Sequence, residues 1–254
     1  YRELKLDLKP GKKGEPGSGG PRGDGTMLTA RGEPMAPGGH AYRIKNLLGW
    51  DLRGAEGIYG ADYQDKSYVL AINALTGDED AARWTARLAE GRDGFPALGE
   101  LLSAAQLEVM VDFLLGVREG RLARPDQVWA LSKQAPKNYT LLPGGDPERG
   151  RDFYGRTCAR CHGGDGAAIL FDDGGYSLGM YGRAKAYEAW FKVLAGQPGT
   201  PMHAQLPAGL GGSAQSALLL DLFAALCDRQ AFPPGDGSKS DVPDGDLRCG
   251  SYLR

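Results

Sequence analysis

Several features that would assign a protein to a class at once are missing from this sequence. No apolar run approaches the roughly 20 residues that cross a bilayer, so we expect no membrane span in this chain. Lys and Arg (30) nearly balance Asp and Glu (32), and without a basic run the sequence predicts no nucleic-acid partner. Alternating apolar and polar residues are also missing, which argues against a fold built on sheets. The sequence begins at Tyr1 rather than Met and shows no charged-then-apolar segment at its start, so we expect a processed or partly ordered mature form.

Cysteine and histidine are scarce, with four and three residues, yet two cysteines and one histidine stand together in TCARCHGG at residues 157–164. A zinc site would usually need a second pair of ligands at short spacing. The remaining candidates form no such pair: Cys227, Cys249, His40 and His203. A thioredoxin-like redox pair would follow a strand in an alternating α/β pattern, which this sequence does not show.

The third interpretation of the motif accounts for the histidine. In Cys-x-x-Cys-His, the two thiols can add across the vinyl groups of haem while the adjacent imidazole binds the iron. All three attachments then come from one helical turn. Cys158 and Cys161 are therefore the candidate attachment residues for one haem c, and His162 is the candidate iron ligand.

Glycine (40) and proline (16) are abundant, and they are dense in residues 1–38, where no periodicity appears. Such a segment cannot bury enough apolar surface to fold alone, so we expect either a disordered tail or an extended arm along a partner subunit. Beyond residue 40, apolar residues recur at i, i+3, i+4 and i+7, which predicts an all-α fold with long Gly/Pro-rich loops. The clearest sets are Leu107, Met110, Val111 and Leu114; Tyr187, Trp190, Phe191 and Leu194; and Leu219, Leu222, Phe223 and Leu226.

The chain also contains an internal repeat. The segment that begins at Ser103 aligns with the one at Gly212, at a constant offset of 109 residues. Residues 53–57 overlay residues 162–166 at the same offset. A repeat of this length indicates a duplicated domain. We therefore predict two tandem helical domains, 39–137 and 138–230, after the arm at 1–38 and before a loop-rich tail at 231–254.

The sequence around the motif resembles the start of a class I cytochrome c, in which a glycine and an aromatic residue of the first helix precede the haem motif. Here these residues are Gly150 and Tyr154. The resemblance covers roughly residues 146–230 and includes a Gly/Pro loop, GQPGTPMHAQL, before a closing helix. In that family a loop methionine binds the far side of the iron, which implies Met202 as the second axial ligand. Ligation by histidine and a thioether leaves no vacant position on the iron and suits electron transfer.

Other residues compete for a place around the iron. His203 is an alternative sixth ligand, because family members usually have proline after the ligand methionine. Met180 is a third candidate, with apolar packing as its ordinary role. Arg160, Arg183 and Tyr181 have the chemistry to bond haem propionates.

The first domain resembles the same fold with its haem site removed. Residues 49–53, GWDLR, overlay the haem motif, so that Gly49, Leu52 and Arg53 replace the two cysteines and the histidine. Phe95 stands where the loop methionine would be. We expect Phe95, Trp50 and Trp84 to fill part of the vacated space, and His40 to be a solvated loop residue. The resemblance thus implies one haem rather than two.

The resemblance also implies an export route, because covalent haem attachment in bacteria takes place outside the cytoplasm. Thiols oxidise there, so we expect a disulfide between Cys227 and Cys249; a thiolate iron ligand is the alternative role for either residue. The resulting hypothesis is a periplasmic, single-haem electron carrier with redox protein partners, acting as a subunit or partner of a respiratory or photosynthetic complex. The alternative is a haem enzyme that acts on a small sulfur compound or peroxide.

Overall fold

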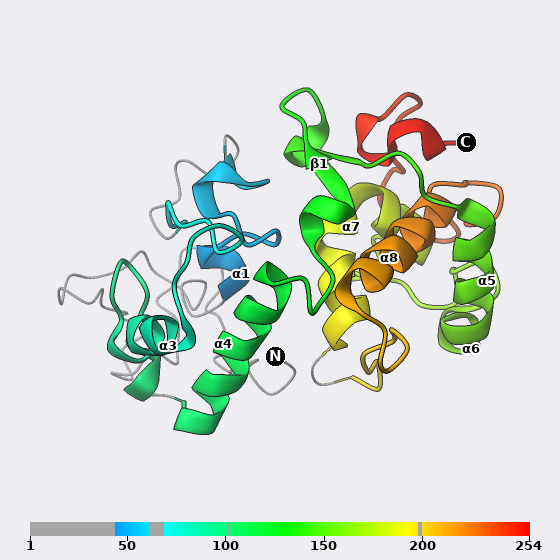
Figure 1. The fold of residues 1–254 in the computed structure, drawn as a ribbon. Coiled ribbons are helices and arrows are strands. Elements are labelled where there is room, and N and C mark those ends of the chain that lie inside the picture. The colour runs from blue at the N-terminus through cyan, green and yellow to red at the C-terminus, as the bar shows by residue number, and fades with distance from the viewer. Residues whose placement is uncertain (1–43, 61–68, 101, 198–199) are drawn as a thin grey trace. The chain divides into compact units, whose positions relative to one another are not determined.

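Helices are the main regular structure of the computed structural model, which describes residues 44–60, 69–100, 102–197 and 200–254 (Figure 1). The chain divides into two units, residues 1–119 and 120–254, and each is described separately. The expected arm at 1–38 and His40 lie outside the described residues. Among the described helices, none combines the length and the hydropathy that a bilayer crossing requires.

The described part of the N-terminal unit is built on two longer helices, each begun by a side-chain cap. Asp80 accepts a hydrogen bond from the N–H of Arg83, and the helix that follows ends at Gly91, which is left-handed (φ 70°). Ser103 and Gln106 cap the next helix reciprocally. The elements are α1 (Ile44–Leu47), η3 (Gly54–Glu56), α3 (Ala81–Glu90), η4 (Leu98–Glu100) and α4 (Ala104–Arg118).

The C-terminal unit is built around the packing of its first and last longer helices, α5 (Pro147–Thr157) and α8 (Gly212–Leu226). A Cβ at Gly150 would stand 2.0 Å from the carbonyl oxygen of Asp221, so only glycine permits this approach. Asp221 also accepts from the Arg149 guanidinium and from the backbone N–H of Asp146, which joins the start of α5 to α8. In the sequence, α6 (Ala159–His162) and α7 (Leu178–Ala195) come between these two helices.

Residues 120–142 lie with the C-terminal unit, whereas the sequence placed most of them in the first domain. The backbone N–H of Ala123 donates to Gln215 on α8, and that of Arg124 donates to Ser216. The segment continues through η5 (Pro125–Gln127), β1 (Trp129–Leu131), η6 (Pro136–Asn138) and β2 (Tyr139–Leu141). The antiparallel pair β1–β2 was not expected, because strands of three residues are too short to show an alternating pattern.

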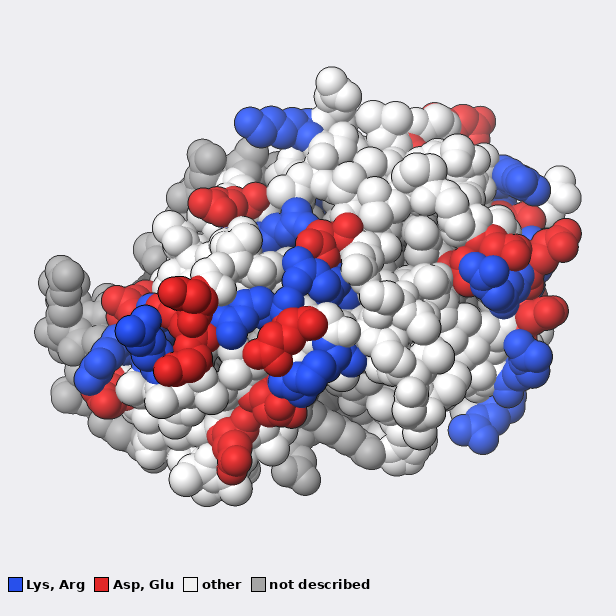
Figure 2. All heavy atoms as spheres, viewed as in Figure 1, with Lys and Arg blue, Asp and Glu red and all other residues white. Residues whose placement is uncertain are grey.

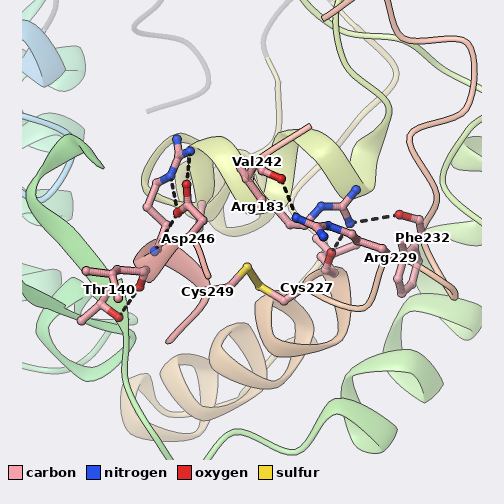
Figure 3. The surroundings of a disulfide bond; sticks show 12 residues. Thr140, Arg183, Cys227, Arg229, Phe232, Val242, Asp246 and Cys249 are labelled. Atoms are coloured by element: carbon pink, nitrogen blue, oxygen red, sulfur yellow. Dashed lines mark hydrogen bonds and ion pairs between the residues drawn. A yellow bond between two sulfur atoms is a disulfide. The ribbon is translucent and has the colours of Figure 1, made fainter. Parts of the chain in front are cut away.

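The tail after α8 folds back over the C-terminal unit and ends in η7 (Leu247–Tyr252). Cys227 and Cys249 are joined by a disulfide, as expected, with their Cα atoms 5.9 Å apart (Figure 3). Arg183 of α7 is buried beneath the tail, where it forms an ion pair with Asp241. The Tyr252 hydroxyl donates to the Leu142 carbonyl. The tail is therefore an integral part of this unit.

Candidate functional site

The Cys-x-x-Cys-His motif occupies a single turn that follows α5. The helix ends at Thr157, and the backbone N–H groups of Cys161 and His162 both donate to the carbonyl of Cys158, at 3.1 and 3.0 Å. Both thiols are free; Cys158 is half-buried and Cys161 is exposed. The turn ends at Gly163, whose φ of 81° suits glycine. The sequence prediction that three reactive side chains share one turn is therefore matched by the backbone.

His162 is buried, with 8% of its surface exposed, and its Nδ1 has no hydrogen-bond partner. Burial lowers the pKa of this imidazole, which keeps it neutral at physiological pH. A neutral imidazole is the form that binds a metal ion. Buried polar atoms normally have partners, so an unpartnered nitrogen beside two free thiols fits a side chain that awaits a ligand.

Aromatic rings pack next to the His162 imidazole. The Phe171 ring lies 5.8 Å from the imidazole, tilted by 31°, and the Tyr181 ring lies 5.2 Å from Phe171. On the other side, the Tyr154 hydroxyl donates to the Gly163 carbonyl, and its ring packs edge-on against Phe232 of the tail at 4.8 Å. The motif turn is therefore held between the first helix, a loop and the tail.

The thiol chemistry argues against a disulfide-exchange role for the motif. Burial, together with a smaller contribution from the neighbouring Cys161, raises the pKa of Cys158 to about 11. Reactive cysteines of redox pairs have a lowered pKa, because the thiolate is the nucleophile. Within the described residues, no group of three or more His, Cys, Asp and Glu is arranged to hold a metal ion.

The candidates for the sixth ligand differ in their surroundings. Met202 is half-buried in the loop before α8, where its N–H donates to Thr200 and its carbonyl accepts from Gln197. His203 is exposed. Met180 is completely buried in α7, and its sulfur would lie 3.0 Å from a Cβ at Gly237. Met180 thus packs against the tail, and Met202 stays the prediction for the ligand.

The proposed propionate residues also have distinct environments. Arg183 is fully buried, and its donors go to Asp241 and to the carbonyls of Leu226 and Phe232, so it anchors the tail. Tyr181 is buried and donates to Glu188. Arg160 is exposed.

Several residues of the N-terminal unit that overlay the haem site of the second domain are buried, although Arg53 is partly exposed. Leu52 has no exposed surface, and its backbone is left-handed (φ 61°). Phe95 is also fully buried and meets Trp84 edge-on, with ring centroids 6.2 Å apart. Trp50 is buried, and the Lys45 ammonium lies 3.9 Å from its ring centroid. Their role in filling a vacated haem site stays a prediction.

Comparison with known proteins supports the interpretation of the C-terminal unit. Residues 145–212 match the family model "Cytochrome C oxidase, cbb3-type, subunit III". The matched segment resembles a cytochrome c domain. No curated protein and no solved structure shows significant similarity to the chain. A cytochrome c domain implies covalently bound haem and electron transfer, and the match begins before α5 and contains the whole Cys-x-x-Cys-His turn.

Sequence reasoning missed two residues near this site, Phe171 and Lys185, and in the N-terminal unit it missed the buried carboxylate of Asp51, which belongs to no recognisable motif. Phe171 packs against the His162 ring, and Lys185 forms an ion pair with Asp172. Neither pair is part of a short sequence motif, so no sequence signal pointed to these two residues. Figure 2 shows charges of both signs over α5 and few charges over α8, whose single charged residue, Asp221, is buried.

Proposed function

We propose that this chain is a single-haem electron-transfer protein. Cys158 and Cys161 hold the haem covalently, His162 is the proximal ligand of its iron and Met202 is the distal ligand. The observation that carries the proposal is the buried, unpartnered imidazole of His162 in the same turn as two free thiols. The match of residues 145–212 to a cytochrome family model supports it.

The haem would supply a one-electron couple, and the protein would supply attachment, ligands and surroundings. The two thiols fix the position of the group through bonds from one rigid turn. The close packing of α5 and α8 keeps that turn in place, because Gly150 lets the helix backbones meet. Phe171 and Tyr181 limit the access of water to the imidazole, and a less polar environment raises the reduction potential.

The N-terminal unit carries no haem in this proposal. Its counterpart of the motif offers Gly49, Leu52 and Arg53, none of which can form a thioether bond or act as a typical iron ligand. The burial of Phe95 and Trp84 supports a filled interior. We propose that this unit is a docking module for a partner.

We further propose that the chain works in the periplasm with redox protein partners, as a subunit or partner of a respiratory or photosynthetic complex. The Cys227–Cys249 disulfide supports an oxidising compartment. The family model is named for a subunit of an oxidase, which favours a respiratory complex.

The haem content tests the proposal directly. We expect a pyridine haemochrome assay to give one haem c per chain, and the intact mass to exceed that of the polypeptide by one haem. Replacing both Cys158 and Cys161 with alanine should remove the covalent haem. A colourless protein with the mass of the bare chain would refute the proposal.

The distal ligand can be tested with a matched pair of variants. We expect Met202→Ala to lower the reduction potential and to let the reduced protein bind carbon monoxide, because it opens the sixth position. The neighbouring His203→Ala should change neither property. The opposite result would assign the ligand to His203, and carbon monoxide binding by the unmodified protein would favour the haem-enzyme alternative.

A further inference from the structure

Helix α7 is interrupted at Lys185, where the backbone leaves helical angles (φ −142°, ψ 38°). An interruption leaves nearby backbone groups in need of partners. Both groups that flank Lys185 find one outside the helix. The N–H of Ala186 donates to the Tyr139 hydroxyl at 3.2 Å, and the Ala184 carbonyl accepts from Arg248 at 3.0 Å. The interruption is therefore supported from two other elements, β2 and η7.

Tyr139 and Arg248, here called the α7 clasp, are themselves firmly held. Tyr139 is fully buried, and its ring packs edge-on against Trp129 at 6.1 Å and Tyr187 at 5.4 Å. Nε and Nη2 of Arg248 donate to the two carboxylate oxygens of Asp246, at 2.9 and 2.7 Å. Figure 3 shows Asp246 in the surroundings of the disulfide that fixes the tail. A bidentate pair with a buried carboxylate sets the orientation of the arginine.

The interruption places the Lys185 side chain over the loop that follows the haem motif. Its ammonium forms an ion pair with Asp172 and lies 4.9 Å from the centroid of the Tyr176 ring and 5.4 Å from that of Tyr181. Asp172 belongs to a tight turn that is closed by a bridge between Phe171 and Tyr176. Lys185 therefore fastens this turn to α7.

The same turn forms one wall of the His162 environment. Phe171 begins the turn, and its ring lies 5.8 Å from the imidazole. A continuous series of contacts thus runs from the clasp through Lys185 and the 171–176 turn to His162. Both clasp residues lie outside the matched segment 145–212.

We propose that Tyr139 and Arg248 are positioning residues for the His162 imidazole, and that they help to set the reduction potential of the haem. This inference rests on the proposed function. When the clasp is intact, Lys185 holds the Phe171 wall against the imidazole and keeps water from that side. When the clasp is lost, the 171–176 turn loosens and the environment of His162 becomes more polar. A more polar environment favours the oxidised iron and lowers the potential.

The test uses the haem-loaded chain with Tyr139→Phe and Arg248→Met. Redox titration should give a lower midpoint potential for both variants than for the unmodified protein. Hydrogen exchange should become faster in residues 171–176 and 184–188. Arg248→Lys keeps a donor that can reach the Ala184 carbonyl, so we expect it to recover part of the potential.

Arg229→Met is the matched control, because Arg229 ties the same tail to Asp241, Asp244 and the Val242 carbonyl, whereas the bonds to the backbone groups beside Lys185 come from Tyr139 and Arg248. We expect it to leave the potential unchanged even where it lowers the melting temperature. An unchanged potential in both clasp variants, or an equal shift in Arg229→Met, would overturn the inference. A chain without haem would instead refute the proposed function, and the exchange rates of residues 171–176 would still show whether the clasp holds the turn.

Discussion

At the scale of single residues, Asp51 is a carboxylate with no exposed surface in the N-terminal unit. Its Oδ2 accepts from the Ile58 N–H at 3.1 Å, whereas its Oδ1 has no hydrogen-bond partner. Burial raises the pKa of Asp51 to about 6, although the Ile58 N–H and the charge of Arg53 act in the opposite direction. A raised pKa means that the folded state retains a proton that the unfolded state has already lost.

This difference predicts a pH dependence of stability. As pH rises from about 4 to 7, the unfolded chain ionises Asp51 first, so the folded protein loses free energy of unfolding. A shift of about two pKa units corresponds to about 3 kcal/mol. We expect Asp51→Asn to remove this loss. The difference in free energy of unfolding between the variant and the unmodified protein should therefore favour the variant more at pH 8 than at pH 5. Urea unfolding at both pH values measures it.

The exposed Asp78→Asn is the control for this prediction. It should change stability by the same small amount at both pH values. If Asp51→Asn behaves in the same way, the carboxyl is not protonated in the folded state and the prediction is wrong.

At the scale of elements, α5 offers two glycines with opposite surroundings. A Cβ at Gly150 would collide with the Asp221 carbonyl at 2.0 Å, whereas a Cβ at Gly155 would meet nothing within 4 Å. We expect Gly150→Ala to force α5 away from α8 and to destabilise the protein by about 1–3 kcal/mol, the usual cost of overpacking. Gly155→Ala should stabilise it by about 0.5–1 kcal/mol, because alanine loses less entropy in a helix. The melting temperatures of the two variants measure this difference. Equal changes in melting temperature would contradict the close packing of α5 against α8 at Gly150.

The sequence predicts some of these elements and not others. Helical periodicity placed α4, α7 and α8, because their apolar faces are long enough to repeat. The motif identified the turn of Cys158, Cys161 and His162, because covalent attachment fixes the spacing of its residues. The interruption at Lys185 left no signal, since the bonds that support it come from Tyr139 and Arg248, far away in the sequence.

At the scale of the whole molecule, the internal repeat predicted two parts, and the structure divides into two units. The sequence could not show that residues 120–137 lie with the second unit, because the bonds from Ala123 and Arg124 reach α8 across 92 residues. The distal ligand is also a property of the assembled fold. The position of Met202 in a Gly/Pro loop predicts a thioether ligand, and the assignment of Met202 to an iron stays a prediction.

The disulfide closes a loop with a sequence separation of 22 between Cys227 and Cys249. A cross-link of this span stabilises a protein by about 3 kcal/mol, by restricting the unfolded chain. We expect Cys227→Ser with Cys249→Ser to lower the free energy of unfolding of the C-terminal unit by about that amount. Chemical denaturation of the oxidised protein measures the change. An unchanged midpoint would show that the packing of Arg183 and Tyr252 alone secures the tail.

The tail has a further practical consequence. Both ends of the 227–249 segment are covalently joined, and the backbone of Arg254 bonds that of Cys227 and Arg229. A protease that cleaves the chain between these cysteines would therefore leave two fragments that migrate together on a gel without reductant and separate when dithiothreitol is added. Protein that has been cleaved in this loop would therefore run as an intact chain on a gel until its disulfide is reduced.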